Sequence, residues 1–418
     1  MNEFEYHGDD LYCEDVPIHK VASDIGTPFY LYSQKTLENH FRVFDTAFSS
    51  ISHITCYSVK ANSNLTVLKI FASLGGGVDV ASGGEIFRAL KTGISPQKIV
   101  YSGVGKSRAE IKYALNSDIL MLNIESPQEL QLIDSIAENI GRKARIALRV
   151  NPDIDPKTHP YISTGLKENK FGINIKDALN EYKKASEKKY IEVIGVACHI
   201  GSQITEVTPF VDVLCNVREF IRELQDQGTG IKYLDLGGGL GITYQDESPP
   251  HPSEYASAII KEMEDLQCTL ILEPGRVIVG NAGILVSQVL YTKKSDDKNF
   301  IIVDAAMNDL VRPSLYEAYH EIKPVKKKQG VLITADIVGP VCESGDFMAR
   351  GRQVPDFAPG DYIAVMSAGA YGFTMSSNYN SRPRVPEVLV DRHRYLVIRR
   401  RETYDDLVRN EVIPEHLS

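Results

Sequence analysis

One lysine of this chain stands where its amine could react with an aldehyde. Lys60 lies in the segment Tyr-Ser-Val-Lys-Ala-Asn at 57–62, directly after the run Ile-Thr-Cys at 54–56, so the sequence predicts that it follows a strand. An amine that loses solvent at the mouth of a strand loses part of its preference for the charged form, and the neutral amine can condense with an aldehyde. Because most lysines are solvated surface residues, Lys60 alone does not establish this chemistry.

Three more apolar runs end in residues that could bind an anion or a flat ring. They end in His-Ile-Gly-Ser-Gln at 199–203, Gly-Gly-Gly-Leu-Gly at 237–241 and Glu-Pro-Gly-Arg at 273–276. Consecutive glycines at a strand end let backbone N–H groups converge on a phosphate without obstruction by Cβ atoms. A tight turn between strand and helix uses the same residues, so the glycines alone fit either interpretation.

His199 and Glu273 each have a structural and a chemical interpretation. Taken alone, His199 fits a hydrogen-bonded core histidine, and the alternative is an imidazole stacked on an aromatic cofactor. A carboxylate such as Glu273, which follows Leu-Ile-Leu at 270–272, is costly to bury without a partner. That partner is either an arginine such as Arg276 or a protonated cofactor ring nitrogen, which would make the ring a stronger electron sink.

The runs that carry these residues belong to a repeating pattern, in which segments of helical periodicity, such as 65–71 and 210–221, separate several of them. The short apolar runs lie at 54–59, 77–81, 98–102, 119–123, 145–150, 193–199, 232–237 and 269–273. Strands that alternate with helices and are buried on both faces predict an α/β fold with a (β/α)8 TIM-like barrel, whose working residues follow the strands. The gap at 151–192 is longer than the others, so we expect an insertion there.

After about residue 280 the sequence changes to short stretches of Val, Ile, Tyr and Thr broken by Gly, Pro and Asp. This pattern of short β-prone stretches predicts a mostly antiparallel C-terminal β domain of the sandwich or barrel type. The strand-like segments at 11–13 and 29–32 are expected to join the same sheet. We therefore predict a barrel domain at 36–281 and a β domain formed by 1–35 and 282–418.

The composition argues against several classes of protein. With 418 residues, of which 43% are hydrophobic and 24% charged, the chain is long enough for two folded domains. Its formal charge of -9 argues against binding to nucleic acid or to an anionic membrane surface. No apolar run is long enough to cross a membrane, so we expect neither nucleic acid nor membrane as a partner. The six cysteines form no paired motif, and the acidic N-terminus is unlike a signal peptide. We expect a cytoplasmic protein with no metal site and no disulfides.

The ordered set of motifs resembles the fold-type III pyridoxal-phosphate decarboxylases of the alanine racemase-like group, and among them the diaminopimelate decarboxylases. The resemblance covers nearly the whole chain, because further motifs follow in the same order. They are Val-Asp-Val-Ala-Ser-Gly-Gly-Glu at 78–85, Met-Asn-Asp-Leu-Val-Arg-Pro at 307–313 with Tyr316, Gly-Pro-Val-Cys-Glu-Ser-Gly-Asp at 339–346 and Ala-Gly-Ala-Tyr-Gly at 368–372. Each motif alone is weakly specific, whereas the ordered set is strongly specific.

The resemblance implies pyridoxal 5'-phosphate as the cofactor. By position, Lys60 would bond to its aldehyde, His199 would stack on its ring and Glu273 would contact its ring nitrogen. The other residues assigned to the cofactor are Asp79, Ser202, Gly238, Gly239, Gly275, Arg276 and Tyr371.

The resemblance also implies decarboxylation of the small amino acid meso-2,6-diaminopimelate to L-lysine and CO2, the last step of lysine biosynthesis. The planar guanidinium of Arg312 can bind a carboxylate with two hydrogen bonds, and the negative carboxylate of Glu343 can pair with the distal ammonium. In this family the Cys342-Glu343 segment enters the site of the neighbouring subunit, so a homodimer with shared active sites is expected. The substrate-binding residues would be Arg276, Arg312, Tyr316, Glu343 and Tyr371.

Some assignments stay open at this point. Cys342 or Lys60 could return a proton to the substrate's α-carbon, but a free cysteine is as often a packed small residue. Ornithine, arginine and carboxynorspermidine decarboxylases share the scaffold, although a substrate without a distal carboxylate would leave Arg312 and Tyr316 without that partner. An alanine racemase would place an arginine at the ring nitrogen where Glu273 stands, and a non-catalytic pyridoxal-phosphate carrier would match the barrel alone.

Overall fold

The computed structural model of the protein describes residues 2–152, 170–296 and 298–417. The chain divides into two compact units, one formed by Glu38–Ile278 and the other by Met1–Leu37 together with Val279–Ser418. The division predicted from the sequence lies after residues 35 and 281. In the described part of the chain, no helix combines the length and the apolar character that a membrane crossing requires.

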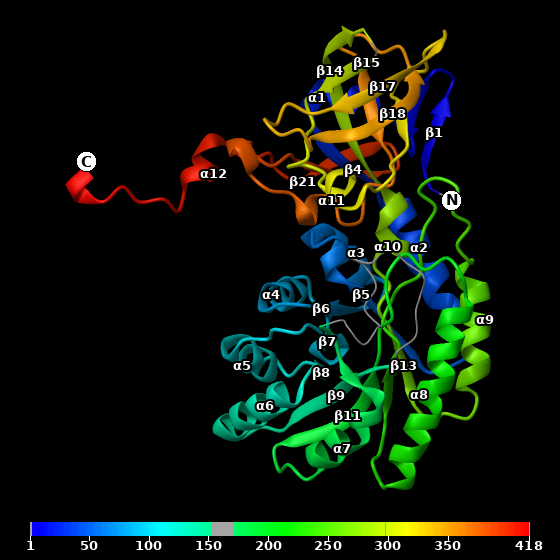
Figure 1. The fold of residues 1–418 in the computed structure, drawn as a ribbon, viewed down its shortest axis with the longest axis vertical. Helices are drawn as coiled ribbons and strands as arrows, with labels where there is room; N and C mark the ends of the chain where they lie inside the picture. Colours follow the sequence, from blue (N-terminus) through cyan, green and yellow to red (C-terminus); the bar gives the residue numbers. More distant parts are fainter. Residues whose placement is uncertain (1, 153–169, 297, 418) are drawn as a thin grey trace. The chain divides into compact units, whose positions relative to one another are not determined.

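The unit Glu38–Ile278 is built around a closed ring of parallel strands (Figure 1). The strands follow one another around the ring in chain order, and the ring closes where β13 pairs with β5. They are β5 (His53–Ser58), β6 (Gly77–Val80), β7 (Ile99–Tyr101), β8 (Met121–Ile124), β9 (Ala144–Asn151), β11 (Ile191–Ala197), β12 (Tyr233–Asp235) and β13 (Thr269–Leu272). Each overlaps one of the predicted apolar runs, so the predicted barrel is confirmed.

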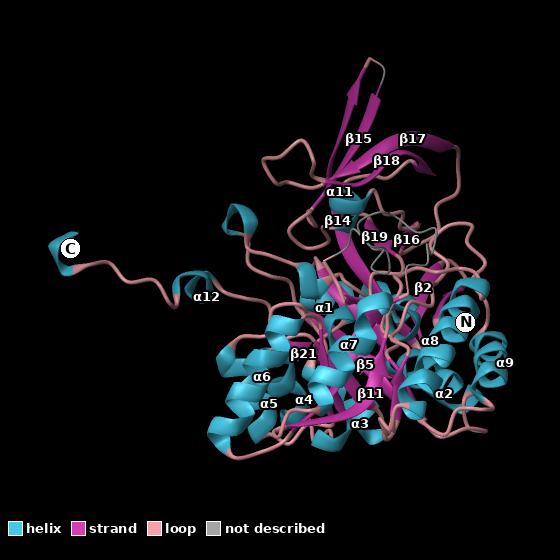
Figure 2. Cartoon of the chain, turned by 60° about the horizontal axis from the view of Figure 1, so that its bottom comes forward, coloured by secondary structure: helices cyan, strands magenta, loops and turns pink. Residues whose placement is uncertain are grey.

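Helices surround the strands of this unit (Figure 2). Their bounds are α2 (Gln34–Ala47), α3 (Leu65–Ser73), α4 (Gly83–Lys91), α5 (Arg108–Asn116), α6 (Pro127–Ile140), α7 (Ile175–Ser186), α8 (Thr208–Asp226) and α9 (Pro252–Met263). A capping box formed by Ser107 and Glu110 starts α5. The apolar residues of α8 recur at helical spacing, so it buries one face, which includes Phe210, Val213 and Phe220.

The predicted insertion at 151–192 lies partly outside the described residues, which omit 153–169. In the described part, β10 (Ile173–Asn174) pairs with the end of β9 and leads directly into α7. Asn174 caps this helix, because its side chain accepts a hydrogen bond from the backbone N–H of Lys176. The segment therefore returns the chain to the barrel pattern.

Polar side chains are buried near the carboxyl ends of the barrel strands. Asp79 in β6, Asn123 in β8 and Asp235 in β12 each occupy the last or second-last position of a strand and are no more than 2% exposed. An apolar cluster of the same unit includes Cys56 and Ile271. Because parallel strands place all their carboxyl ends on one rim, the buried polar groups are gathered there.

The second unit contains a mixed, mostly antiparallel sheet. Its longest path runs β18-β17-β15-β14-β4-β20-β21, and β19 pairs with both β14 and β16. Only the pairs β15–β17 and β20–β4 are parallel among the described residues, so the predicted antiparallel character is confirmed. The strands are β4 (Phe29–Ser33), β14 (Gly283–Ser295), β15 (Lys298–Val303), β16 (Ile322–Pro324), β17 (Leu332–Val338), β18 (Phe347–Pro355), β19 (Tyr362–Val365), β20 (Glu387–Asp391) and β21 (Arg394–Arg399).

The N-terminal segments of this unit divide between two sheets. The predicted strand at 29–32 is β4, which lies between β14 and β20 in the large sheet as expected. The prediction for 11–13 is wrong, because this segment is β2 (Asp10–Cys13), the middle strand of a separate sheet. Its partners in that sheet are β1 (Phe4–His7) and β3 (Val16–Pro17). Its link to the large sheet is an isolated antiparallel bridge between Asp10 and Lys326, two residues beyond β16. Helix α1 (Ile18–Ile25) follows and contributes Ile18 to the apolar core of this unit.

Candidate active site

Lys60 lies at the carboxyl end of β5, in the short 3-10 turn Val59–Ala61. Its Nζ atom is 3.2 Å from Asp79 Oδ2, and the same oxygen accepts a hydrogen bond of 2.7 Å from the hydroxyl of Ser58. The Lys60 side chain is 43% exposed, whereas that of Asp79 is 1% exposed. The supposition that the amine loses solvent at the strand mouth is therefore wrong for this structure; the buried carboxylate of Asp79 orients the amine instead.

His199 follows β11 and is fixed through its ring. Its Nδ1 atom accepts a hydrogen bond of 3.2 Å from the backbone N–H of Gly238. Burial, with the nearby charges of Arg149 and Lys60, lowers the pKa of His199 well below its usual value. A neutral imidazole whose Nδ1 accepts must carry its proton on Nε2. The side chain is hydrogen-bonded and half-buried on the rim.

The glycine run after β12 is a turn that leaves no space for side chains. Gly237 and Gly239 have φ values of 70° and 125°, which favour glycine. A Cβ atom on Gly238 would lie 2.2 Å from the carbonyl oxygen of Glu273. The turn is joined to the loop after β11, because the N–H of Ile204 donates to the carbonyl of Gly239 at 2.9 Å. The two glycine-containing loops are thus adjacent on the rim.

Arg276 and Ser202 meet although they follow different strands. The guanidinium of Arg276 donates from Nη2 to Ser202 Oγ at 3.0 Å and from Nη1 to the hydroxyl of Tyr244 at 2.7 Å. Arg276 is 6% exposed. Gly275 precedes it, and a Cβ atom there would be 3.0 Å from Ser58 Cβ. A buried guanidinium beside a hydroxyl and two glycine loops is a suitable set of groups for a phosphate.

Glu273 faces other acids rather than an arginine. Its carboxyl shares a hydrogen bond with that of Asp235, and the hydroxyl of Ser102 donates to its Oε1 at 3.3 Å. Burial, followed by the charges of Asp235 and Asp79, raises its pKa well above the usual value. In the described part of the chain Glu273 forms no ion pair with Arg276, so the salt-bridge interpretation is wrong.

The rim fits a flat, phosphorylated cofactor that carries a basic ring nitrogen. Asp79 Oδ1 is buried and has no hydrogen-bond partner among the residues that the structure describes. Buried polar atoms in this state favour an additional polar ligand. The acidic surroundings of Glu273 favour a cation beside it, and the Arg276–Ser202 pair favours an anion. Pyridoxal 5'-phosphate has both features and an aldehyde that Lys60 can bind.

Arg312 and Tyr316 belong to the second unit and are the first and last residues of helix α11 (Arg312–Tyr316). Arg312 is 6% exposed, and its Nη1 atom is 3.0 Å from His320 Nε2. His320 is fully buried, and its Nδ1 lies 2.8 Å from the carbonyl oxygen of Met366. His320 therefore donates to Met366 and accepts from Arg312, which fixes the direction of the guanidinium.

Cys342 and Glu343 are both exposed on the loop between β17 and β18. The interpretation of Cys342 as a packed apolar residue is therefore wrong. The backbone N–H of Cys342 donates to Asn380 Oδ1 at 2.9 Å, and the hydroxyl of Tyr379 donates to Glu343 Oε2 at 2.9 Å. The segment 379–380 thus holds both residues of the pair.

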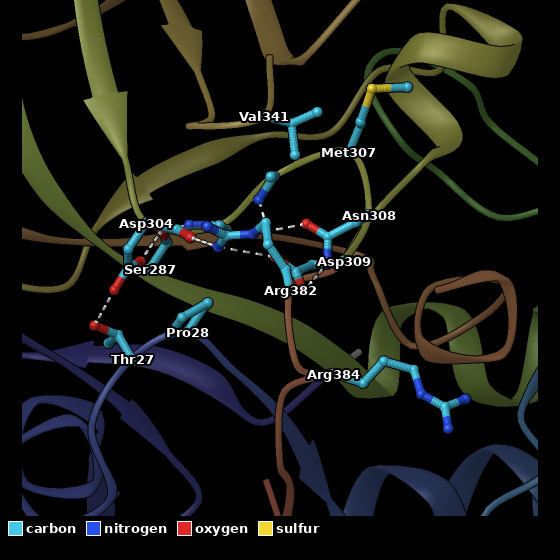
Figure 3. Close-up of polar contacts among 12 residues, drawn as sticks. Thr27, Pro28, Ser287, Asp304, Met307, Asn308, Asp309, Val341, Arg382 and Arg384 are labelled. Atoms are coloured by element: carbon cyan, nitrogen blue, oxygen red, sulfur yellow. Dashed lines mark hydrogen bonds and ion pairs between the residues drawn. The ribbon is translucent and has the colours of Figure 1, made fainter. Parts of the chain in front are cut away.

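Buried acids join this loop to the segment that leads to α11. Asp346 accepts hydrogen bonds from the backbone N–H groups of Met307 at 2.6 Å and Val341 at 2.7 Å. Figure 3 shows Arg382 beside Asp304, Asn308 and Asp309 in the same region. Arg382 donates to Asn308 Oδ1 at 3.0 Å and to the carbonyl of Asp304 at 2.6 Å. The segments that carry Arg312, Cys342 and Glu343 are therefore parts of one hydrogen-bonded assembly.

Tyr371 lies in this unit with φ at 56°, a value that is unusual for an aromatic residue. Such conformations cost about 1–3 kcal/mol and cluster at functional sites. The next residue, Gly372, is tightly packed, since a Cβ atom there would lie 2.5 Å from the carbonyl oxygen of Ala368. Tyr371 is therefore held in a defined backbone position.

The structure thus gathers the predicted residues of the barrel on one rim, namely Lys60, Asp79, His199, Ser202, Gly238, Gly239, Glu273, Gly275 and Arg276. The residues of the second unit are held within that unit. Sequence reasoning missed the residues that support both sets, which include Asp235, Asn123, His320, Tyr379 and Asn380. Only Asp235 carried a signal, because it is an acid inside an apolar run, two residues before the glycines.

The chain is similar to known proteins along nearly its full length. The family described as pyridoxal-dependent decarboxylase, pyridoxal binding domain, matches residues 34–280. A diaminopimelate decarboxylase of Vibrio cholerae is 50% identical over 420 residues, which covers 99% of this chain and 100% of the relative. One of Aquifex aeolicus is 49% identical over 405 residues, or 97% of this chain and 96% of the relative.

Solved structures give the same result. The structure of diaminopimelate decarboxylase from Helicobacter pylori complexed with L-lysine matches with a TM-score of 0.92 at 45% identity, covering 94% of this chain and 99% of that one. The corresponding M. jannaschii structure with L-lysine matches with a TM-score of 0.95 at 38% identity and covers 100% of both chains.

Proposed function

This chain belongs to the pyridoxal-dependent decarboxylases, and we propose that it converts meso-2,6-diaminopimelate to L-lysine and CO2, the last step of lysine biosynthesis. It is a carboxy-lyase that uses pyridoxal 5'-phosphate. The observation that carries the proposal is the rim of the barrel, where the Lys60 amine, the buried Glu273 carboxyl and the Arg276–Ser202 pair follow separate strands. The full-length similarity to diaminopimelate decarboxylases supports this choice of substrate.

The cofactor supplies an aldehyde that bonds to an amine and a ring that takes up the electrons of the bond being broken. Lys60 would provide the amine that holds the cofactor, and Asp79 orients this amine. His199, neutral and fixed through Nδ1, would stack on the ring. Glu273 places its carboxyl at the ring nitrogen.

A second set of groups on the same rim would hold the phosphate. Arg276 and Ser202 supply charged and neutral donors that are already in contact. The close-packed glycines let the loops approach the phosphate without side chains between them. The remaining contributors are Gly238, Gly239, Gly275 and Tyr371, and Asp79 completes the cofactor-binding set.

Substrate selection depends on residues that bind both ends of a molecule with two amino-acid groups. Arg312 and Tyr316, with Arg276 and Tyr371, bind carboxylate, and Glu343 binds the distal ammonium. The support for Arg312 is its buried guanidinium, which His320 holds in one direction. The proton that replaces CO2 on the α-carbon comes from Cys342, which is exposed beside Glu343, or from Lys60.

We extend the proposal to assembly and location. The domain 1–35 with 282–418 completes the active site of the barrel domain 36–281 of a second copy, so a homodimer is the smallest active form. The exposure of both Cys342 and Glu343 in the single chain supports a role across a subunit boundary. A cytoplasmic location accompanies this biosynthetic activity.

The cofactor part of the proposal is tested by absorbance. Purified protein supplied with pyridoxal 5'-phosphate should show a near-visible band that borohydride removes while attaching the cofactor to Lys60. The variant Lys60→Ala should lack the band and the covalent product, and mass spectrometry of the digested protein should locate the adduct. A wild-type protein with no such band would contradict the proposal.

The substrate part is tested by release of CO2. The enzyme should act on meso-diaminopimelate and much less on ornithine, arginine or lysine, and L-lysine should appear in equal amount with CO2. The variant Glu343→Gln should lose this preference, because the distal ammonium loses its charged partner. Faster release from ornithine than from meso-diaminopimelate would overturn the assignment.

A further inference from the structure

Asp235 lies next to Glu273 and has no role in the cofactor and substrate binding proposed above. It is the last residue of β12, is 1% exposed and is held from two directions. The side-chain amide of Asn123 donates to its Oδ2 at 2.7 Å, and the backbone N–H of Gly237 donates to its Oδ1 at 3.0 Å. Its carboxyl also shares a hydrogen bond with that of Glu273.

The strand register explains why these two acids meet. Asp235 in β12 is aligned with Ile271 in β13, and Glu273 lies two residues beyond Ile271. Because side chains alternate along a strand, Ile271 and Glu273 share one side, and Asp235 lies next to them on the neighbouring strand. The contact is therefore set by the backbone of the barrel.

We propose that Asp235 is a positioning residue for the cofactor: it holds the carboxyl of Glu273, through a shared proton, in the orientation in which Glu273 binds the ring nitrogen. This inference rests on the proposed function, since it assigns Asp235 a task only where Glu273 faces that nitrogen. It also explains why an acid occupies the end of β12, where an apolar residue would be less costly to bury.

The charges around the pair determine where the proton resides. Two carboxyl groups in contact in a buried site cannot both ionise readily. Burial is the main cause that raises the pKa of both, to about 6 for Asp235 and well above the usual value for Glu273. Both oxygens of Asp235 accept hydrogen bonds, from Asn123 and from Gly237, which favours its ionised form, so Glu273 holds the shared proton. The charge of Asp79 raises the pKa of Glu273, and the charge of Lys60 lowers it.

A cation beside Glu273 reverses this distribution. A positive ring nitrogen stabilises the ionised form of Glu273, and Asp235 is the adjacent acceptor that can take the shared proton and return it as a hydrogen bond. Glu273 is then an anion that accepts a hydrogen bond from protonated Asp235. The hydroxyl of Ser102 donates to the carboxyl of Glu273 and accepts a hydrogen bond of 3.1 Å from Asn123. The amide of Asn123 therefore contacts both Asp235 and Ser102, the two residues that hold Glu273.

The test compares two cofactors that differ only at the ring nitrogen. Protein freed of cofactor is titrated with pyridoxal 5'-phosphate and with its 1-deaza analogue, in which a C–H group replaces that nitrogen, and binding is followed by absorbance. Wild-type protein should prefer the natural cofactor. Asp235→Asn should reduce this preference by about tenfold or more, while the affinity for the 1-deaza analogue should change little.

Glu273→Gln separates this inference from the proposed function. If Glu273→Gln reduces the preference and Asp235→Asn leaves it at the wild-type value, the positioning role is overturned. If Glu273→Gln itself leaves the preference unchanged, the role proposed for Glu273 fails first. A general packing defect would weaken both cofactors equally in Asp235→Asn and would also overturn the inference.

Should Asp235→Asn not fold, Asn123→Ala provides a second approach, because it removes the amide that holds Asp235. The same titration should then show a reduced preference with an intermediate loss, and an unchanged preference would again overturn the inference.

Discussion

Asp309 makes the stability of the second unit depend on pH in a direction opposite to that of most carboxylates. The side chain is 1% exposed, and it accepts hydrogen bonds from the N–H of Ala306 at 3.0 Å and from the amide of Asn308 at 3.1 Å. Burial raises its pKa from 3.8 to about 7, although the Ala306 bond and the charge of Arg382 oppose this rise. The folded protein therefore holds the proton more tightly than the unfolded chain does.

The sign and size of the effect follow from this difference. Below about pH 4 both states are protonated, so the contribution of Asp309 to stability is fully present. Between about pH 4 and 7 the unfolded chain loses the proton first, and the free energy of unfolding falls by about 1.4 kcal/mol per pH unit. The total loss by pH 8 is about 4 kcal/mol for this shift.

Asp309→Asn removes the titration and keeps an oxygen for the N–H of Ala306. The variant should therefore gain stability relative to wild type as the pH rises, by about 4 kcal/mol between pH 4 and pH 8. Any cost of placing an amide beside Asn308 is the same at every pH. It therefore changes the difference in free energy of unfolding by a constant amount and leaves its dependence on pH unchanged. Because the chain has no tryptophan, urea unfolding is best followed by far-ultraviolet circular dichroism at several pH values.

The matched control is Asp356→Asn, which removes a carboxyl from an exposed position of the same unit. A difference between Asp309→Asn and wild type that stays constant from pH 4 to pH 8 would refute the argument. So would a difference that grows towards low pH, since this would mean that the folded state prefers the ionised acid.

Three further predictions concern the rim, the substrate loop and the barrel core. Gly238→Ala should weaken cofactor binding by about tenfold or more, because its Cβ would lie 2.2 Å from the Glu273 carbonyl, whereas Gly105→Ala, with no atom within 4 Å, should bind normally in the same absorbance titration. Tyr379→Phe should raise KM for meso-diaminopimelate several-fold at constant kcat, and steady-state assays should show no added effect in a Glu343→Gln background. Lys106→Met should destabilise the barrel by about 3–5 kcal/mol in urea unfolding, because it leaves Glu129, 2.7 Å from the amine, buried without its cation.

Each of these has a contrary outcome. Wild-type cofactor affinity in Gly238→Ala would mean that the loop can move away from Glu273 without loss. An equal rise of KM caused by Tyr379→Phe with and without the Glu343 carboxylate would show that Tyr379 does not act through Glu343. Lys106→Met combined with Glu129→Leu should recover most of the lost stability, and failure to do so would mean that the ion pair is not the cause.

The barrel could be predicted from the sequence because its strands are buried on both faces. Such strands read as continuous apolar runs, and each predicted run overlaps a strand of the ring. The side chains at the strand ends could be found for the same reason, since the end of a run marks the rim. The segment 11–13 was assigned to the wrong sheet because its alternating pattern identifies a strand and not its neighbours.

The supporting contacts could not be predicted, because they depend on register and on distant parts of the chain. Asp235 meets Glu273 only through the alignment of β12 with β13. Tyr379 reaches Glu343 across 36 positions of the sequence, and no local pattern connects the two. The amine of Lys60 is oriented by Asp79 rather than stripped of solvent, and this depends on the pairing of β5 with β6, in which Ser58 is aligned with Asp79.

The acids at the rim also link cofactor binding to the stability of the barrel. Asp79, Asp235 and Glu273 are each less than 7% exposed, and mutual repulsion raises the pKa of Glu273 beyond the effect of burial. A cationic ring nitrogen relieves this repulsion only in the folded protein, where the three acids are together. A ligand that binds only the folded state stabilises it in proportion to the logarithm of its concentration. The barrel should therefore melt at a higher temperature with pyridoxal 5'-phosphate than without it, and the gain should be smaller with the 1-deaza analogue, because that ring brings no cation to the acids.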